Sequence, residues 1–231
     1  MSSAQESGAQ GSGRPLNAGD FAAWIGRAAE LVAADADRLT RLDAAIGDGD
    51  HGHNMDRGLR AATEALSGLP EDAPPGKVLI TAGRAIVSRT GGASGPLYGT
   101  ALRRAGKALG DAAEVDAAAL GSALRAALEG VRELGKAAEG DKTMVDALAP
   151  AVAAWEAALA GASRDGGATP AGCARAAADA AERGADATVP MQARKGRASY
   201  LGARSTGHMD PGAASTALIL RALAEVAGRG E

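Results

Sequence analysis

The chain has 231 residues, a formal net charge of −3 with acids and bases interspersed, and only 2% aromatic residues. This length is enough for one domain, or at most two small ones, and the mixed charge argues against a general nucleic-acid-binding surface. No window has the roughly 18 consecutive apolar residues of a membrane span, and the polar N-terminus has no apolar signal core, so we expect a cytoplasmic protein without a membrane segment.

The first 15 residues are rich in Ser, Gly and Gln and contain almost no apolar side chains. Such a segment buries too little apolar surface to offset the entropy of ordering it. We therefore expect a disordered N-terminal tail at residues 1–15 and a single domain over residues 16–231.

From Leu16 onward, apolar residues recur at the three- and four-residue spacing of an amphipathic helix, and the first helix is predicted to run to about Leu42. Further helices are predicted over residues 54–66 and 76–89, from about residue 95, after Asp116 or a neighbour as N-cap, past residue 141, from 169 to about 187, and from 210 onward. Strand-like alternation is nearly absent. The sequence thus predicts an all-α fold of about eight helices.

The segment after the first predicted helix concentrates carboxylates and glycines. Asp43, Asp48 and Asp50 lie within eight positions, and the intervening glycines allow the backbone to turn so that the three carboxylates converge. Converging carboxylates repel one another unless a hard divalent cation lies between them. Because Mg²⁺ completes its coordination with water and phosphate oxygens, we expect a nucleotide nearby and favour phosphoryl transfer as the chemistry.

Three other interpretations of this segment are weaker. In the first, Asp48 and Asp50 are only solvated turn residues and Asp43 is a charge at a helix C-terminus. That charge is unfavourable there without a cation. A calcium-binding EF-hand would need a bidentate Glu at its twelfth position, which is Leu59 here. A zinc site built from His51, His53 and the distant His208 would have no thiol ligand and would lie beside hard carboxylates.

Three more loops carry groups suited to anions. Residues 90–96 lead from glycines into a helix start, where free N–H groups and the helix dipole favour phosphate, although a tight turn would explain the same pattern. Residues 140–144 form a second such junction, which a helix cap explains equally well. Residues 191–204 concentrate Arg and Lys in a long segment without helical period, which suits a diphosphate, an acidic partner or a plain solvated loop.

Four stretches, LDAAIGDGDHGHNM, GGASGPLYGT, GDKTM and QARKGRASYLGARSTGHMDPGA, resemble in the same order the nucleotide-binding L subunit of dihydroxyacetone kinase. The resemblance covers roughly residues 16 to 228. It implies a barrel-like bundle of eight antiparallel helices, with a nucleotide site formed by loops at one end. The helix count expected from periodicity agrees with this fold.

The resemblance also implies roles for individual residues. Asp43, Asp48 and Asp50 would bind two Mg²⁺ ions and, together with Arg197, would carry the catalysis. Ala93 and Ser94 would contact phosphate, Gly135 and Met144 the adenine side, and Arg197 the phosphates. The full set implied around the ADP or ATP is His51, Gly52, His53, Asn54, Ala93, Ser94, Gly135, Met144, Arg197, Asp210, Pro211 and Gly212.

In the phosphotransferase-system version of this kinase, a K subunit binds dihydroxyacetone and an M subunit donates phosphoryl from a phosphohistidine. The L subunit keeps its nucleotide as a cofactor and is inactive without these partners. Two alternatives stay open, namely an ATP-dependent kinase subunit for dihydroxyacetone or another small ketose, and a nucleotide-dependent regulatory binding module. The phosphoryl donor, the ketose and the choice between monomer and homodimer are also left open.

Overall fold

The computed structural model describes residues 13–162 and 167–230. Most of the expected N-terminal tail, residues 1–12, lies outside this part of the chain. The last three residues assigned to the tail are described and contact the folded body, since the Arg14 guanidinium forms an ion pair of 2.7 Å with Asp20.

The regular secondary structure of the described residues is almost entirely helical, as the sequence predicts. The helices are α1 (Ala18–Ala34), α2 (Ala36–Ile46), α3 (His51–Leu66), α4 (Pro75–Arg89), α5 (Ser94–Leu109), α6 (Ala117–Gly135), α7 (Val145–Ala162), α8 (Pro170–Ala187) and α9 (Pro211–Ala227). Two short 3₁₀ segments, η1 (Arg197–Ser205) and η2 (Gly228–Gly230), complete the helical content.

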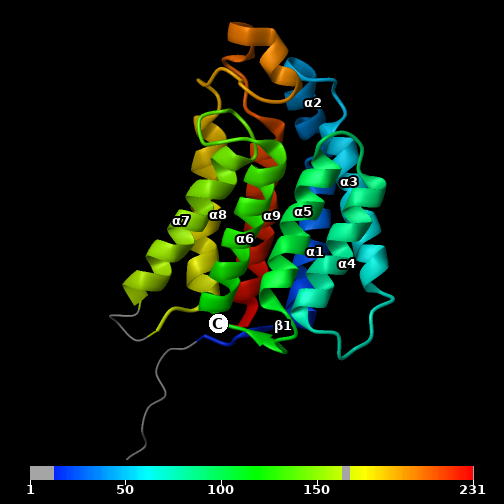
Figure 1. Cartoon of the computed structure of the whole chain (residues 1–231), viewed down its shortest axis with the longest axis vertical. Helices are drawn as coiled ribbons and strands as arrows, with labels where there is room; N and C mark the ends of the chain where they lie inside the picture. Colours follow the sequence, from blue (N-terminus) through cyan, green and yellow to red (C-terminus); the bar gives the residue numbers. More distant parts are fainter. Residues whose placement is uncertain (1–12, 163–166, 231) are drawn as a thin grey trace, which may run out of the picture.

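Eight of the described helices form a closed ring. Each helix packs on the next in the order α1, α3, α4, α5, α6, α7, α8, α9, and α9 packs back on α1 (Figure 1). The remaining helix, α2, contacts α3, α9 and η1 at one end of the ring. The expectation of a barrel-like bundle of eight helices is therefore confirmed, with α2 as an additional cap.

The single first helix predicted from Leu16 to Leu42 is wrong in one respect, because the chain breaks at Asp35 into α1 and α2. The Asp35 N–H still bonds to Leu31 and Val32 in α1, whereas its carboxylate pairs with Arg38 in α2 at 2.6 Å. Residues 33–37 offer only Ala and Asp to the bundle, so no large apolar side chain favours continuing the helix along the ring.

The end of the ring opposite α2 contains a small strand pair that the sequence does not predict. β1 (Leu16–Asn17) pairs antiparallel with β2 (Glu114–Val115), with Leu16 opposite Val115. Both of these apolar side chains are buried. Since each strand has only two residues, the fold remains all-α.

Small side chains allow the ring helices to approach one another closely. Trp155 of α7 is fully buried, and its indole N–H donates to the Ala117 carbonyl at 2.9 Å while its ring lies against Gly121. Helix α7 is long and apolar enough, by length and composition alone, to cross a membrane. It packs against α6, α8 and α9 within the bundle, which accounts for its apolar character.

Candidate functional site

A cavity of about 280 Å³ opens at the end of the ring that carries α2 and η1. It is lined by the α2–α3 loop, the loop before α5, the C-terminal end of α6 with the loop that follows, and the start of α9. Part of residues 191–204, called the basic segment below, also lines it. Of the residues that the resemblance implied, the cavity brings together Asp43, Asp48, Asp50, His51, Ala93, Ser94, Gly135, Met144, Arg197, Asp210, Pro211 and Gly212.

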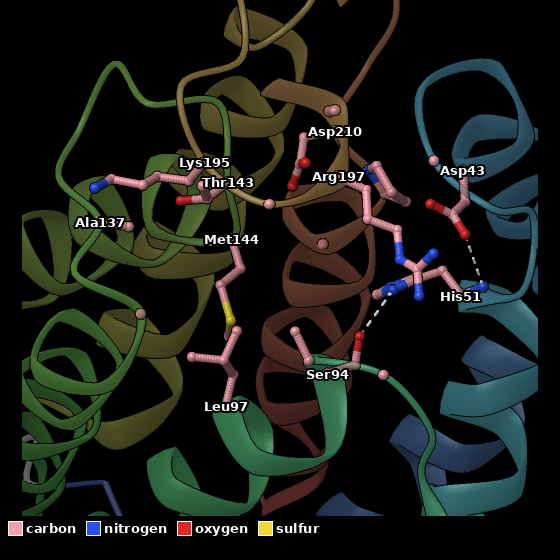
Figure 2. Close-up of a pocket in the computed structure, with 18 of the residues that line it drawn as sticks. Asp43, His51, Ser94, Leu97, Ala137, Thr143, Met144, Lys195, Arg197 and Asp210 are labelled. Atoms are coloured by element: carbon pink, nitrogen blue, oxygen red, sulfur yellow. Dashed lines mark hydrogen bonds between the residues drawn. The ribbon is translucent and has the colours of Figure 1, made fainter. Parts of the chain in front are cut away.

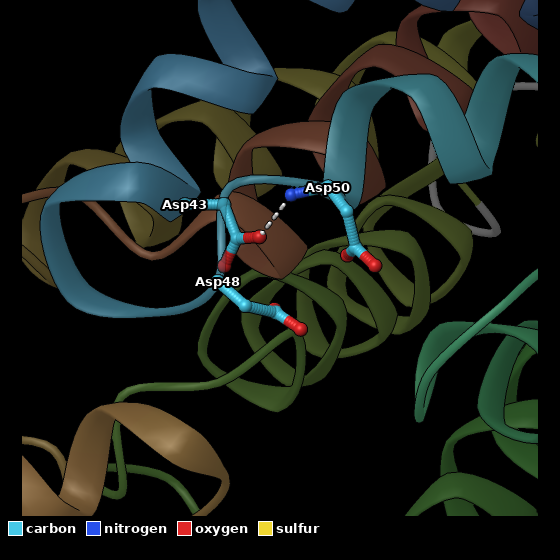
Figure 3. Close-up of side chains that lie close together, drawn as sticks. All are labelled: Asp43, Asp48 and Asp50. Atoms are coloured by element: carbon cyan, nitrogen blue, oxygen red, sulfur yellow. Dashed lines mark hydrogen bonds between the residues drawn. The ribbon is translucent and has the colours of Figure 1, made fainter.

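The three carboxylates converge as the spacing predicts. One oxygen each from Asp43, Asp48 and Asp50 lies within 4.8 Å of the other two (Figure 3). Asp43 lies in the last turn of α2, Asp48 and Asp50 lie between α2 and α3, and all three line the cavity. The donor set consists only of hard carboxylate oxygens, which fits Mg²⁺.

Asp43 is held in place by the start of α3. Its Oδ2 accepts hydrogen bonds from the backbone N–H groups of Asp50, at 2.9 Å, and His51, at 3.2 Å. These N–H groups have no carbonyl partner within the helix, and the positive end of the helix dipole also stabilises a carboxylate. The N-terminus of α3 thus offsets part of the Asp43 charge that was expected to require a cation. Helix α3 begins at His51, and not near Asn54 as predicted.

Two glycines allow the loop between α2 and α3, residues 47–50 (the acidic loop), to make a tight turn. A Cβ at Gly47 would overlap the Asp43 carboxylate, so only glycine leaves room for that side chain. Gly49 has a φ of 74°, in the left-handed region that other residues rarely adopt. Together they place Asp48 and Asp50 opposite Asp43.

His51 connects the acidic loop to the helix starts behind it. Its ring Nδ1 lies 3.1 Å from Ser94 Oγ (Figure 2). Its Nε2 lies 2.8 Å from Ser215 Oγ. Burial lowers the pKa of His51, against the smaller raising effects of Asp43 and Asp50, and so favours the neutral form of the ring. Both ring nitrogens are occupied by hydroxyl groups, and a zinc site at His51 therefore finds no support.

The loop before α5 brings a helix N-terminus to the cavity. Ala93 and Ser94 lie at the first turn of α5, directly after Gly92, whose φ is 66°. The first N–H groups of a helix have no intrahelical partner, and the positive end of the dipole favours anions. This wall of the cavity is therefore suited to phosphate.

The other side of the cavity is apolar. Leu97, Val131, Ala137, Met144 and Val145 line it, and Gly135 ends α6 beside them. Figure 2 shows Leu97 and Met144 on one side of the cavity and Asp43 and His51 on the other. A ligand that fills this cavity must therefore combine a flat or apolar part with a charged part.

Arg197 is the cation that reaches the acidic cluster. Its guanidinium forms an ion pair of 3.1 Å with Asp48, and 69% of its side chain is exposed. Lys195 also lines the cavity. Both residues belong to the basic segment, part of which forms η1 instead of the irregular loop that the sequence suggests.

Lys142, which sequence reasoning missed, fixes the base of this basic segment. Its side chain is only 1% exposed, and its ammonium group donates to the carbonyl oxygens of Thr188, at 2.7 Å, and His208. Burial lowers the pKa of Lys142. The lysine lies in GDKTM, but only the folded chain shows that it connects the residues before α7 with the residues on both sides of the basic segment.

Asp210 closes the cavity at the start of α9, where it acts as the N-cap. Its carboxylate accepts from the Ala213 N–H at 2.7 Å. Burial raises the pKa of Asp210 to about 7, and the nearby Asp146 adds to this effect. A partly protonated Asp210 repels an anionic ligand less than a full carboxylate would.

Three of the implied nucleotide contacts lie outside the cavity lining. Gly52 is buried against the backbone of Ala36, where α3 crosses α2. The His53 side chain is exposed. Asn54 is buried and accepts a 2.5 Å hydrogen bond from Arg57 beneath the loop before α5, so it supports this loop from behind.

Residues 45–225 match the DAK2 domain family. The chain therefore belongs to this family. It is similar to the ADP-binding subunit DhaL of the PEP-dependent dihydroxyacetone kinase of Escherichia coli, with 41% identity over 87% of this chain and 93% of the relative. The corresponding subunit of dihydroxyacetone kinase 1 of Listeria innocua is 42% identical over 87% and 92%.

Longer kinases contain the same unit. The D-erythrulose kinase of Mycolicibacterium smegmatis is 42% identical over 85% of this chain, which spans only 33% of that kinase. Among solved structures, the dihydroxyacetone kinase of C. freundii in complex with AMP-PNP and Mg²⁺ superposes with a TM-score of 0.63 and 27% identity, over 97% of this chain and 37% of that one.

Proposed function

We propose that this chain is the ADP/ATP-binding subunit of a dihydroxyacetone kinase, which holds a magnesium nucleotide at the end of its helical ring. The observation that carries the proposal is the cavity itself. Three carboxylates within 4.8 Å of one another form one side, and an apolar surface around Met144 forms the other. A nucleotide has two parts that match these two sides, a charged polyphosphate and a flat base.

The charges of the acidic side favour two Mg²⁺ ions, held by Asp43, Asp48 and Asp50. One divalent cation would leave the three carboxylates with a net negative charge, which would still repel a diphosphate. Two divalent cations would make the net charge of the cations and the three carboxylates positive. When bound, the cations neutralise charge on the phosphate oxygens.

The chain's own residues orient the nucleotide and exclude water from it. The free N–H groups around Ala93 and Ser94 bind phosphate oxygens at the start of α5. Gly135 and Met144 contact the base, and Arg197, which reaches across from the basic segment to Asp48, contacts the transferred phosphoryl group. Asp210, Pro211 and Gly212 close the nucleotide edge of the cavity.

We propose that the partners of this subunit are a K subunit, which binds dihydroxyacetone, and an M subunit, which donates phosphoryl from a phosphohistidine. The relatives of similar length are named as ADP-binding subunits of PEP-dependent kinases. In this scheme the nucleotide remains bound as a cofactor in the cytoplasm, the phosphoryl group passes through it, and no covalent nucleophile is needed from this chain.

Reconstitution tests this function directly. The purified chain is mixed with Mg²⁺, a K subunit with dihydroxyacetone, a phosphorylated M subunit and ADP at about the concentration of the chain. We expect many turnovers to dihydroxyacetone phosphate per ADP, and native mass spectrometry should find ADP bound to the chain. Failure to bind ADP in the presence of Mg²⁺ would refute the proposal, and binding without any transfer would instead indicate a regulatory module.

A second candidate is supported by the 42% identity to a D-erythrulose kinase, within which this unit forms about a third of the chain. The same cavity could then use free ATP to phosphorylate dihydroxyacetone or another small ketose. Product formed in proportion to added ATP, without dependence on phosphorylated M subunit, would favour this candidate.

A further inference from the structure

A chain of buried hydroxyl groups leads from the interior of the ring to Ser94 through His51. Tyr98 Oη lies 2.8 Å from Thr216 Oγ1 and 2.8 Å from Ser215 Oγ. Ser215 Oγ lies 2.8 Å from His51 Nε2, and His51 Nδ1 lies 3.1 Å from Ser94 Oγ. Of these groups, His51, Ser94 and Tyr98 line the cavity, whereas Ser215 and Thr216 lie behind them.

We infer that Tyr98 and Ser215 are positioning residues that fix the direction in which the Ser94 hydroxyl donates its proton. Each hydroxyl has one proton and a neutral imidazole has one N–H. Tyr98 Oη also lies 2.8 Å from the Gly212 carbonyl oxygen, so Tyr98 can donate either to that carbonyl or to Ser215. Two arrangements follow, which place the His51 ring proton on opposite nitrogens. The inference rests on the proposed nucleotide function, because it concerns how Ser94 meets a phosphate.

In the first arrangement, His51 carries its proton on Nε2 and donates it to Ser215. Ser215 then donates to a carbonyl oxygen, either that of Pro211 at 3.0 Å or that of Gly212 at 3.2 Å. Tyr98 donates to the Gly212 carbonyl at 2.8 Å. The unprotonated Nδ1 accepts the Ser94 hydroxyl proton, so Ser94 presents only lone pairs to the cavity. A phosphate oxygen, which is also an acceptor, would be repelled.

In the second arrangement, all donors point the other way. Thr216 donates to Tyr98, Tyr98 donates to Ser215, and Ser215 donates to His51 Nε2. The proton on Nδ1 is then donated to Ser94, whose own hydroxyl proton is free to bind a phosphate oxygen. A bound phosphate therefore selects this arrangement, and Tyr98 supports it because its proton fills the Ser215 oxygen while Ser215 donates.

The two arrangements differ in an observable property, the tautomer of His51. Long-range ¹H–¹⁵N NMR distinguishes the two neutral tautomers, and the spectrum contains only three histidines, His51, His53 and His208. A His51→Gln variant assigns the signals. We expect the Nδ1–H tautomer of His51 in the wild-type chain saturated with Mg²⁺ and ADP.

The Tyr98→Phe variant tests the contribution of the hydroxyl chain. Without the Tyr98 proton, the Ser215 oxygen is filled only if His51 donates to it from Nε2. We expect the ADP-bound variant to shift toward the Nε2–H tautomer and to bind ADP about three- to tenfold more weakly, the size of one net hydrogen bond. Tyr200→Phe is the control, because that side chain is 89% exposed.

Calorimetry on the same samples separates the possible failures. A wild-type chain that binds ADP with His51 in the Nε2–H form would overturn this inference and leave the proposed function intact. The same conclusion would follow if Tyr98→Phe matched Tyr200→Phe in both tautomer and ADP affinity. Absence of ADP binding by the wild-type chain would overturn the proposed function and this inference together.

Discussion

Replacement of Asp48 or Asp50 by Asn is expected to lower the affinity for Mg²⁺–ADP by at least about 100-fold while the helical ring stays folded. Loss of groups that merely support metal ligands already costs about 10–100-fold, and these two carboxylates are proposed to bind the metal directly. Both side chains are exposed, so the free energy of unfolding should change by no more than about 0.5 kcal/mol. Calorimetry measures the affinity, and circular dichroism follows the fold.

The matched control is Asp56→Asn, on α3, the helix that follows the loop holding Asp48 and Asp50. Asp56 forms an ion pair of 2.7 Å with Arg60 on α3 and does not line the cavity. This variant should bind Mg²⁺–ADP like the wild-type chain. Equal binding by the Asp48→Asn, Asp50→Asn and Asp56→Asn variants would show that the acidic trio does not hold the metal.

Replacement of Arg197 by Met is expected to slow phosphoryl transfer by about 100- to 1000-fold and to weaken ADP binding by a much smaller factor. A preorganised cation acts mainly on the charge that develops in the transition state, and arginines in phosphoryl transfer have large effects on the rate. Steady-state rates in the reconstituted kinase, set beside calorimetric affinities, separate the two effects.

Arg125→Met provides the control for this prediction. Arg125 also forms an exposed ion pair, of 2.6 Å with Glu156, but it does not line the cavity. Its replacement should leave transfer unchanged. If Arg197→Met reduced binding and transfer by the same factor, Arg197 would be a binding residue without a particular role in the transfer step.

The helices and their caps were predictable because they depend on local sequence. Asp116, Thr169 and Asp210 each cap a helix through a bond to a backbone N–H three residues later, as their positions predict. The break at Asp35 was not predictable in this way, because apolar spacing alone does not reveal where the ring ends and the cap begins. The position of the break depends on where the other helices leave space for buried side chains.

The same distinction applies to the site. The convergence of Asp43, Asp48 and Asp50 follows from short spacing and glycines, so it could be predicted from the sequence. Lys142 binds carbonyl oxygens 46 and 66 positions away, and Tyr98 meets Ser215 117 positions away. These contacts arise only when the ring closes.

The central claim is that the acidic trio holds divalent cations that bind the phosphates of a nucleotide. Anomalous diffraction from crystals grown with Mn²⁺ and ADP tests it most directly, since Mn²⁺ takes the same oxygen ligands as Mg²⁺. Two anomalous peaks are expected among the oxygens of Asp43, Asp48 and Asp50, each in contact with the ADP phosphates. ADP bound in the cavity with no anomalous peak at these carboxylates, or bound elsewhere on the protein, would contradict the claim.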